Sequence, residues 1–117
     1  MAIVFSGGKA TASCPTGPFE TLQNLQFAGR YTVQVKNTGS AAVVGMLTRS
    51  LSDNEGNENT ASDPVEVGAG ATVNISELLH LTVAYATQGS KTMTFKATFL
   101  AGGETDTRTD QCAVQIG

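Results

Sequence analysis

His80 is the only histidine in the chain, so it is the first residue to test for catalytic or metal-binding chemistry. A Ser-His-Asp or Cys-His arrangement needs an imidazole held by a partner, and a zinc site usually needs several histidine or cysteine ligands. His80 lies between Leu79 and Leu81 in an alternating segment, which places its ring on the side opposite to the leucines. The sequence therefore predicts a surface strand residue rather than a catalytic base.

The acidic stretch 53–58 (DNEGNE) offers the carboxylate and amide oxygens that calcium prefers. Its glycine falls at the fourth position and no glutamate closes a twelve-residue loop, so an EF-hand is excluded. A looser calcium site that also uses Asp63 stays open beside a simpler interpretation, a solvated loop over residues 52–63. We favour the solvated loop, and we predict no metal-binding residue.

Three carboxylates, Glu104, Asp106 and Asp110, alternate with threonine near the end of the chain. Paired carboxylates perform acid–base chemistry only if something buries one of them, and a row of this kind is typical of a solvated strand face. The segment 7–9 (GGK) lacks the first glycine, the following Ser or Thr and the helix of a phosphate-binding loop. No nucleophile, base and orienting group come together, so we predict no enzyme activity, no catalytic residue and no cofactor.

The two cysteines, Cys14 and Cys112, lie near opposite ends of the chain. A bond between them would close nearly the whole chain and link its first strand to its last, which favours a disulfide. Two separate buried thiols or a bridge between subunits remain open as alternatives. Metal binding is less favoured, because two isolated thiols cannot fill a tetrahedral site.

The elements that would carry these residues are strands. Residues 91–101 (KTMTFKATFLA) place Met93, Phe95 and Phe99 on one side of an extended chain and threonine with Lys96 on the other. Similar alternation recurs along the chain, with turn signals such as 37–40 (NTGS) and 68–70 (GAG) between the runs. We therefore predict an all-β sandwich of about seven to nine short antiparallel strands, in a single domain over residues 1–117. Residues 1–8 are expected to be an N-terminal arm or an edge strand.

The segments 31–40 (YTVQVKNTGS) and 65–75 (VEVGAGATVNI) resemble bacterial immunoglobulin-like sandwiches related to cell-adhesion modules, a fold that also occurs in virion proteins. The resemblance covers the middle third to half of the chain. It implies an immunoglobulin-like Greek-key sandwich with a binding or spacer role. The first 28 residues and the cysteine pair depart from that pattern.

Composition limits the partners. A net charge of −3 and a pI of about 4.9 disfavour a nucleic-acid backbone as a partner. No apolar run approaches the roughly 18 residues that cross a bilayer, so no membrane insertion is expected. The start of the chain (MAIVF) lacks the features of a secretion signal, which leaves open a trimmed exported segment or a protein made without export. We expect a virion or an extracellular, cell-surface location.

The surface feature with most meaning for function is the uncharged threonine side of the predicted strands. Only 15% of the residues are charged, against about 25% in a typical domain, and the cores of protein interfaces are also poor in charge. Thr92, Thr94 and Thr98 form one row, and Thr105, Thr107 and Thr109 form another. The simpler interpretation is that threonine suits a solvated strand. The predicted interface also includes an arm that adds to a neighbour's sheet edge, formed by Ala2, Ile3, Val4 and Phe5.

These observations favour a non-catalytic structural subunit of a larger assembly, of the virion decoration, tail or surface-filament type. Its partners would be copies of itself or a neighbouring structural protein, held through sheet-face and strand-edge contacts. The alternative is an adhesive or ligand-binding immunoglobulin-like module of an extracellular surface protein, which binds through loops such as residues 52–63.

Overall fold

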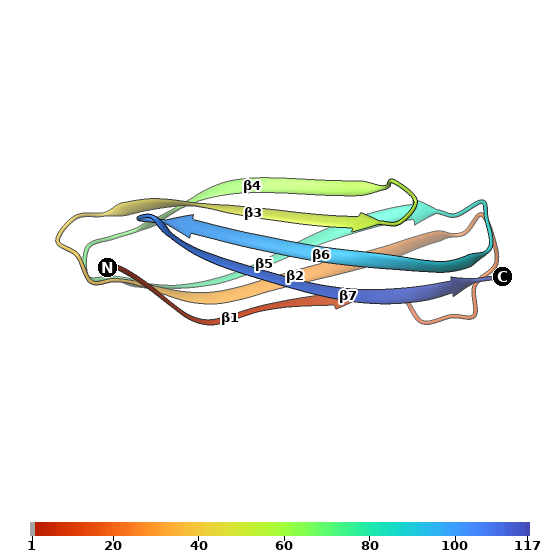
Figure 1. Ribbon diagram of the computed structural model, residues 1–117, viewed down its shortest axis with the longest axis horizontal. Coiled ribbons are helices and arrows are strands. Elements are labelled where there is room, and N and C mark those ends of the chain that lie inside the picture. The colour runs from red at the N-terminus through yellow and green to blue at the C-terminus, as the bar shows by residue number, and fades with distance from the viewer. Residues whose placement is uncertain (1) are drawn as a thin grey trace.

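The computed structural model describes residues 2–117 and consists of seven antiparallel strands in two sheets (Figure 1). No helix in the described residues is long and apolar enough to cross a membrane. The strands are β1 (Ile3–Ser13), β2 (Asn24–Asn37), β3 (Val43–Asp53), β4 (Glu58–Val67), β5 (Thr72–Ala84), β6 (Gly89–Ala101) and β7 (Glu104–Ile116). The predicted all-β sandwich is therefore confirmed.

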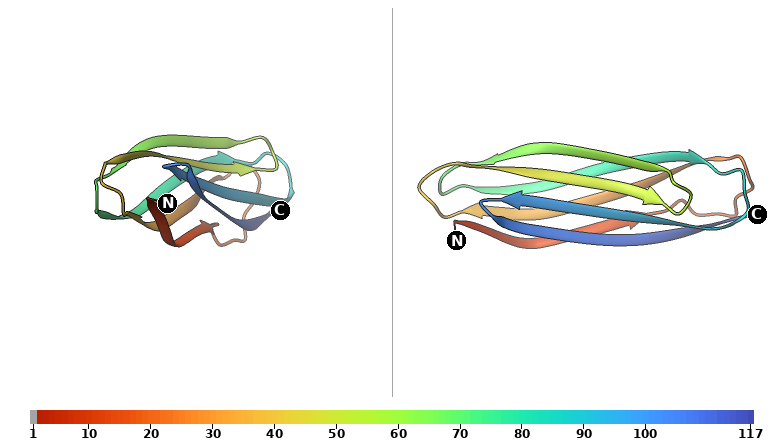
Figure 2. Two further views of the ribbon diagram at one scale, coloured as in Figure 1. Left: turned by 60° about the vertical axis from the view of Figure 1, so that its left-hand side comes forward. Right: turned by 45° about the horizontal axis from the view of Figure 1, so that its top comes forward.

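The sheets form two layers (Figures 1 and 2). One has three strands in the order β1-β2-β5, and the other has four in the order β4-β3-β6-β7. The molecule is a rod of 56 × 19 × 16 Å, and its two ends of chain lie at opposite ends of the long axis (Figure 1). Each sheet therefore offers one long outer face, and the rod has two distinct ends.

The core lies between the sheets and is built by the alternation seen in the sequence. In β6, Met93, Phe95, Ala97 and Phe99 are all buried, because every second side chain of a strand points to the same side. Phe5 meets Phe99 edge-on, with ring centroids 5.6 Å apart. Buried side chains of both sheets form one continuous hydrophobic cluster. Its burial is the main driving force for folding.

The strands are longer than the pattern of turns indicated, at 10 to 14 residues each. Val73 and Leu79, which belong to separate short apolar runs in the sequence, lie in the same strand β5. β1, an edge strand of its sheet, continues through residues 6–8 with an irregular register between Ser6 and Lys9. Polar residues and glycines interrupt the apolar pattern inside these strands. The strands are continuous because they pair with segments far away in the sequence, and the local pattern does not reveal that pairing.

The solvated loop predicted for residues 52–63 is wrong as well. Only a tight turn separates β3 from β4, and residues 58–63 belong to β4, the edge strand of the four-stranded sheet. Residues 58–63 lack large aliphatic side chains, and the inner side of this part of the edge is partly polar. Asp63 there pairs with Arg49 of β3, so a hydrogen-bonded ion pair takes the place of an apolar contact.

Candidate functional site: the threonine face and the ends of the rod

The outer side of the four-stranded sheet, here called the threonine face, gathers the threonine rows predicted from the sequence. Register pairs Thr98 with Thr48 on one side and with Thr107 on the other, so hydroxyl groups cross three neighbouring strands. Thr98 and Thr107 lie 3.2 Å apart between Oγ1 atoms, and Thr48 Oγ1 lies 3.1 Å from Ser62 Oγ. Two pairs of hydroxyls thus bond to one another across the strands. The charged residues in the outward register of this face are Glu58, Glu66 and Lys96.

An apolar cluster lies at one end of the threonine face. Val44 and Met46 of β3 and Leu100 of β6 are 65%, 44% and 49% exposed. Met46 pairs with Leu100 across the strands, and Val44 follows Met46 on the same side of β3. These three residues, here called the apolar patch, are contiguous, whereas the exposed Leu78 and Val4 lie apart on the opposite sheet. Contiguous exposed apolar surface is typical of an interaction site.

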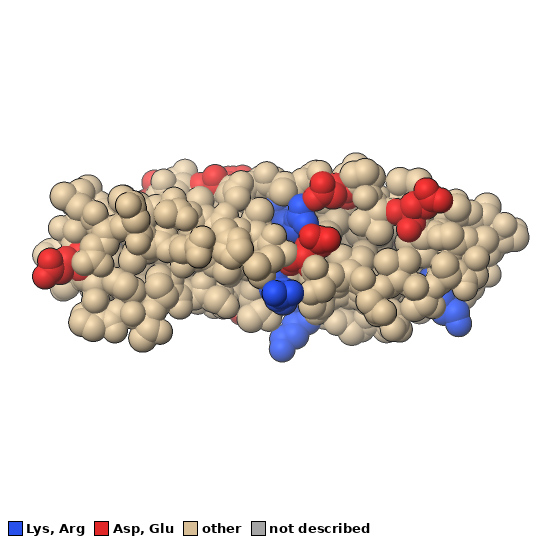
Figure 3. Space-filling view, turned by 180° about the vertical axis from the view of Figure 1, so that it is seen from behind, with Lys and Arg blue, Asp and Glu red and all other residues tan. Residues whose placement is uncertain are grey.

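The opposite sheet has a different character. Its outward charged side chains are basic, and they are Lys9, Arg30 and Lys36. Figure 3 shows this side of the molecule, where uncharged residues cover most of the surface and the charged side chains stand in small groups. Apolar side chains do not join across these strands as they do in the apolar patch, since Val4 pairs with Lys36 and Leu78 with Arg30.

The structure separates the two parts of the interface predicted from the sequence. Thr92, Thr94 and Thr98 lie on the threonine face, partly exposed. Ile3, Val4 and Phe5 pair with β2 in the other sheet, and Ile3 is buried. Residues 3–5 therefore form an edge strand of their own domain rather than an arm for a neighbour. The exposed Ala2 is held by a hydrogen bond of 2.6 Å from Thr38 N to its carbonyl oxygen, and Met1 lies outside the described residues.

The predicted disulfide is confirmed. Cys14 and Cys112 are bonded, with their Cα atoms 5.8 Å apart. Cys14 follows β1 of one sheet and Cys112 lies in β7 of the other, so the bond joins the two sheets along one side of the sandwich. The free-thiol and intersubunit alternatives therefore do not describe this fold.

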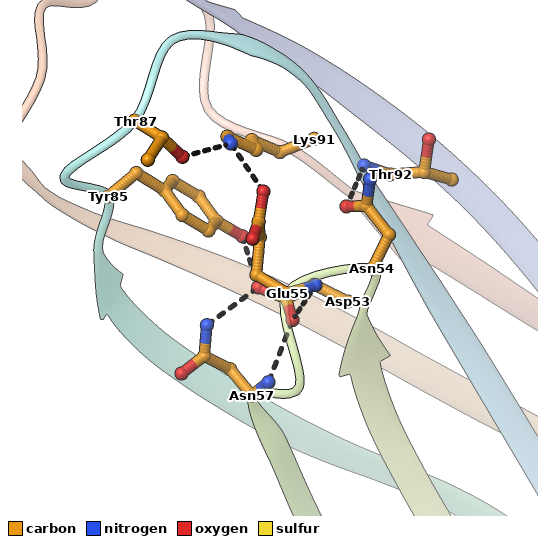
Figure 4. Close-up of polar contacts among 8 residues, drawn as sticks. All are labelled: Asp53, Asn54, Glu55, Asn57, Tyr85, Thr87, Lys91 and Thr92. Atoms are coloured by element: carbon orange, nitrogen blue, oxygen red, sulfur yellow. Dashed lines mark hydrogen bonds and ion pairs between the residues drawn. The ribbon is translucent and has the colours of Figure 1, made fainter.

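The acidic turn between β3 and β4 is tied into the fold (Figure 4). Asp53 accepts hydrogen bonds from the backbone N–H groups of Glu55 and Asn57 and from the side chains of Asn57 and Tyr85. Burial alone would raise the pKa of Asp53, but these hydrogen bonds outweigh it and lower the pKa below its usual value. Its oxygen atoms thus face donors, an arrangement unsuited to a cation.

Lys91 closes the same end of the rod from β6. Its buried ammonium group donates to Glu55 at 2.5 Å and to Thr87 at 2.8 Å, and it lies 5.3 Å from the centroid of the Tyr85 ring (Figure 4). Glu55 is therefore neutralised by an ion pair instead of being available as a ligand. In residues 2–117 no group of three or more His, Cys, Asp or Glu side chains is arranged to hold a metal ion.

The carboxylates of β7 are not the solvated row expected from the sequence. Asp106 is only 6% exposed. It accepts a hydrogen bond of 2.8 Å from Tyr31 and forms an ion pair with Arg108 at 2.9 Å. Asp110 accepts a hydrogen bond from Ala12 N at 2.7 Å. Asp106 thus contacts β2 and Asp110 contacts β1, so both carboxylates join the two sheets. His80 lies exposed on the outer side of β5, whereas Asp106 and Asp110 point toward the space between the sheets.

The sequence interpretation missed the apolar patch, although part of the signal was present. Leu100 has the same parity as Thr94 and Thr98 in β6, so alternation places it on the outer side. Met46 shares the outward parity of Thr48. What the sequence alone does not reveal is that Met46 and Leu100 are cross-strand partners.

No protein-family model and no curated protein sequence matches the chain. Among solved structures, a β-glucuronidase from Bacteroides uniformis aligns at 13% identity over 91% of this chain and 13% of that chain, with a TM-score of 0.48. A putative β-galactosidase from Bacteroides fragilis aligns at 12% identity over 92% and 17% of the two chains, with a TM-score of 0.47. Spo0M, a sporulation control protein from Bacillus subtilis, aligns at 16% identity over 93% and 49%, with a TM-score of 0.34. The chain spans a small part of both glycosidases, and at these scores the likeness carries no conclusion about activity.

Proposed function

We propose that this protein is a non-catalytic structural subunit of a larger assembly, of the virion decoration, tail or surface-filament type, and that it associates through its threonine face. The observation that carries the proposal is the apolar patch of Val44, Met46 and Leu100 within a face of mutually bonded hydroxyl groups. Such a face combines exposed apolar side chains with little charge, as the cores of protein interfaces do.

The size of the face supports this proposal. Four strands about 4.8 Å apart, with a rise of about 3.3 Å per residue, give an area of roughly 19 by 40 Å, or about 760 Å². A stable protein interface buries about 800 Å² on each partner. The threonine face is thus large enough for one partner of ordinary size, and a second copy of the chain is the simplest candidate because two-fold contacts are the commonest in oligomers.

A matched pair of substitutions tests the proposal. Met46→Lys places a charge in the apolar patch, and Leu78→Lys places one at a similarly exposed site, 44% against 41%, on the opposite sheet. Sedimentation velocity over a range of concentrations should show self-association of the wild type that Met46→Lys weakens and Leu78→Lys retains. A wild type that stays monomeric at every concentration, or equal effects of both variants, would contradict association through this face.

A second function is an adhesive or ligand-binding, immunoglobulin-like module of a surface protein. The observation that favours it is the position of the two ends of the described chain at opposite ends of a 56 Å rod (Figure 1), which suits modules joined in series. The turn at residues 53–57 is a poor binding loop, since Asp53 and Glu55 are already paired. In the same sedimentation experiment, a stable monomer would favour this second function.

A further inference from the structure

A pocket of about 550 Å³ lies at the end of the rod where the chain ends. Its walls are residues 14–19, which follow β1, together with Gly117 and residues 113–115 of β7. The volume is within the range of about 300 to 1,000 Å³ that is usual for binding sites. The pocket lies at the opposite end of the rod from the apolar patch, so the two are separate features.

The frame of the pocket is fixed at both ends. At one end the Cys14–Cys112 disulfide ties the loop to β7. At the other end Phe19 forms a parallel bridge with Ile116, and Gly117 N donates to the Phe19 carbonyl oxygen at 3.0 Å. Pro15 and Pro18 between these ends have restricted backbone angles and no N–H group. A site held in this way loses little conformational freedom when it binds.

One wall of the pocket is an open strand edge. β7 is the last strand of its sheet and pairs along its length only with β6. Because Gly117 directs its N–H group to the loop and backbone groups alternate along a strand, Ala113 and Gln115 direct theirs to the same side. The Phe19–Ile116 bridge and the bond from Gly117 N join the loop to the C-terminal end of β7, and within residues 2–117 no backbone bond joins the loop to Ala113. The Ala113 N–H and C=O groups thus face the pocket without a backbone partner from the loop.

The other walls are uncharged and largely apolar. Pro15, Pro18, Phe19 and Val114 supply the apolar surface, and none of the lining side chains carries a charge. An open strand edge recognises the backbone of an extended chain, and a neighbouring pocket recognises one of its side chains. We propose that this pocket binds a short, extended, uncharged protein segment, which pairs with the edge of β7 at Ala113 and places one apolar side chain against Pro15 and Pro18.

The frame also limits the length of the bound segment. The disulfide at Cys112 and the bridge at Ile116 leave about three residues of β7 edge between them, a span of roughly 10 Å at 3.3 Å per residue. The occupant is therefore a chain end or the tip of a loop of a partner protein rather than a full strand. Acidic segments are disfavoured, because no lining side chain offers them a positive charge.

Peptide titration tests this proposal directly. The probe is the capped peptide acetyl-Ser-Thr-Val-Thr-Ser-amide, titrated into the 15N-labelled protein. Saturable shifts are expected for amides of residues 14–19 and 113–117, with a hydrogen-bond shift at Ala113 N–H. Two control peptides replace the valine by N-methylvaline or by aspartate. Each should bind about tenfold more weakly or worse, since the first loses a backbone hydrogen bond and the second buries an unpaired charge.

A matched pair of variants locates the pairing on the strand edge. Ala113→Pro removes an N–H group that points away from β6, a position where an edge strand tolerates proline. It should abolish the peptide-induced shifts. Gln111→Pro makes the same change on the same edge outside the pocket and should retain them. Dispersed amide spectra check that both variants fold, and the peptide controls do not depend on them.

Several outcomes would overturn the proposal. No saturable shift with the valine peptide would remove the site. Equal binding of the valine and N-methylvaline peptides, or full binding by Ala113→Pro, would show an apolar pocket that does not use the strand edge. Because the titration uses monomeric protein, for example the Met46→Lys variant, its result is independent of whether the chain self-assembles.

Discussion

Tyr31 of β2 donates a hydrogen bond of 2.8 Å to Asp106 of β7, and this bond joins the two sheets inside the sandwich. The Tyr31 side chain is fully buried and Asp106 is nearly so. Arg108 balances the charge of the carboxylate from the solvent side. Gly8 of β1 covers the group closely, since a Cβ at this position would overlap the Asp106 carboxylate. At Gly8 the side of the sandwich between β1 and β7 is thus closed by a polar contact.

Replacing Tyr31 by phenylalanine should destabilise the fold by about 1 to 3 kcal/mol, because a buried carboxylate oxygen loses its donor while the ring is kept. Urea unfolding, followed by circular dichroism, measures the change. Thr82→Ala, an exposed strand position on β5, is the control and should change stability by less than about 0.5 kcal/mol. Equal stability of Tyr31→Phe and the wild type would show that the bond contributes nothing net.

Stability should also fall in alkaline solution. Burial and the hydrogen bond to Asp106 raise the pKa of Tyr31, and burial with the bond to Asp53 raises that of Tyr85. The unfolded chain therefore loses these protons first, near its ordinary pKa of about 10, and stability decreases as the pH rises above that value. Unfolding free energies measured at several pH values around 10 should decline for the wild type. The decline should be smaller for Tyr31→Phe, and an unchanged slope would speak against the raised pKa of Tyr31.

Alternation was sufficient to predict the all-β class and which side of a strand faces the core, but not the strand lengths, because the inward side of each strand is apolar over most of its length. Phe95 and Phe99 are buried as their parity requires. The cysteine pair was also predictable, since Cys14 directly follows the first strand and Cys112 lies in the last. These features depend on local pattern or on position in the chain. They need no knowledge of side-chain partners.

The failures concern residues whose partners are distant in the sequence. Asp106 has inward parity, but it was interpreted as solvated because Tyr31, its partner, lies 75 residues away. Arg49 is buried on the same side of β3 as Leu47 and Leu51. Its charge is balanced there by ion pairs with Asp63 and Glu77. The apolar patch was missed for the same reason, since strand pairing creates it. Composition alone does not determine which strands become neighbours.

Acid should destabilise the turn between β3 and β4. Since hydrogen bonds hold the pKa of Asp53 below its usual value of 3.8, the unfolded chain takes up the proton at a higher pH than the folded protein does. The contribution of Asp53 is therefore present above the unfolded pKa and is lost as the pH falls through the folded pKa. Urea unfolding between about pH 6 and about pH 2.5 should show a steeper loss for the wild type than for Asp53→Asn. Parallel curves for the two proteins would contradict this assignment.

Gly29 of β2 should not tolerate even a methyl group. A Cβ there would overlap ring atoms of Phe95, which is fully buried in the facing sheet. Gly29→Ala should therefore cost about 1 to 3 kcal/mol through overpacking. Gly68→Ala is the matched control, because its Cβ would meet only Ala71, at 3.7 Å, and it should be neutral or slightly stabilising. Thermal unfolding of both variants distinguishes the two environments, and similar melting temperatures would argue against the close packing of Phe95 on Gly29.

The disulfide gives a prediction about additivity. Its loop closes nearly the whole chain, with a sequence separation of 98, so its loss should cost about 4 to 5 kcal/mol in the chain-entropy model. Either Cys14→Ser or Cys112→Ser breaks the same bond, and the double variant should therefore be about as stable as each single variant. Urea unfolding of all three proteins, with the wild type in the presence and absence of reductant, measures these changes. If the double variant instead lost the sum of the two single effects, the cysteines would act as independent buried groups. A wild-type dimer on a non-reducing gel would indicate a bond between subunits.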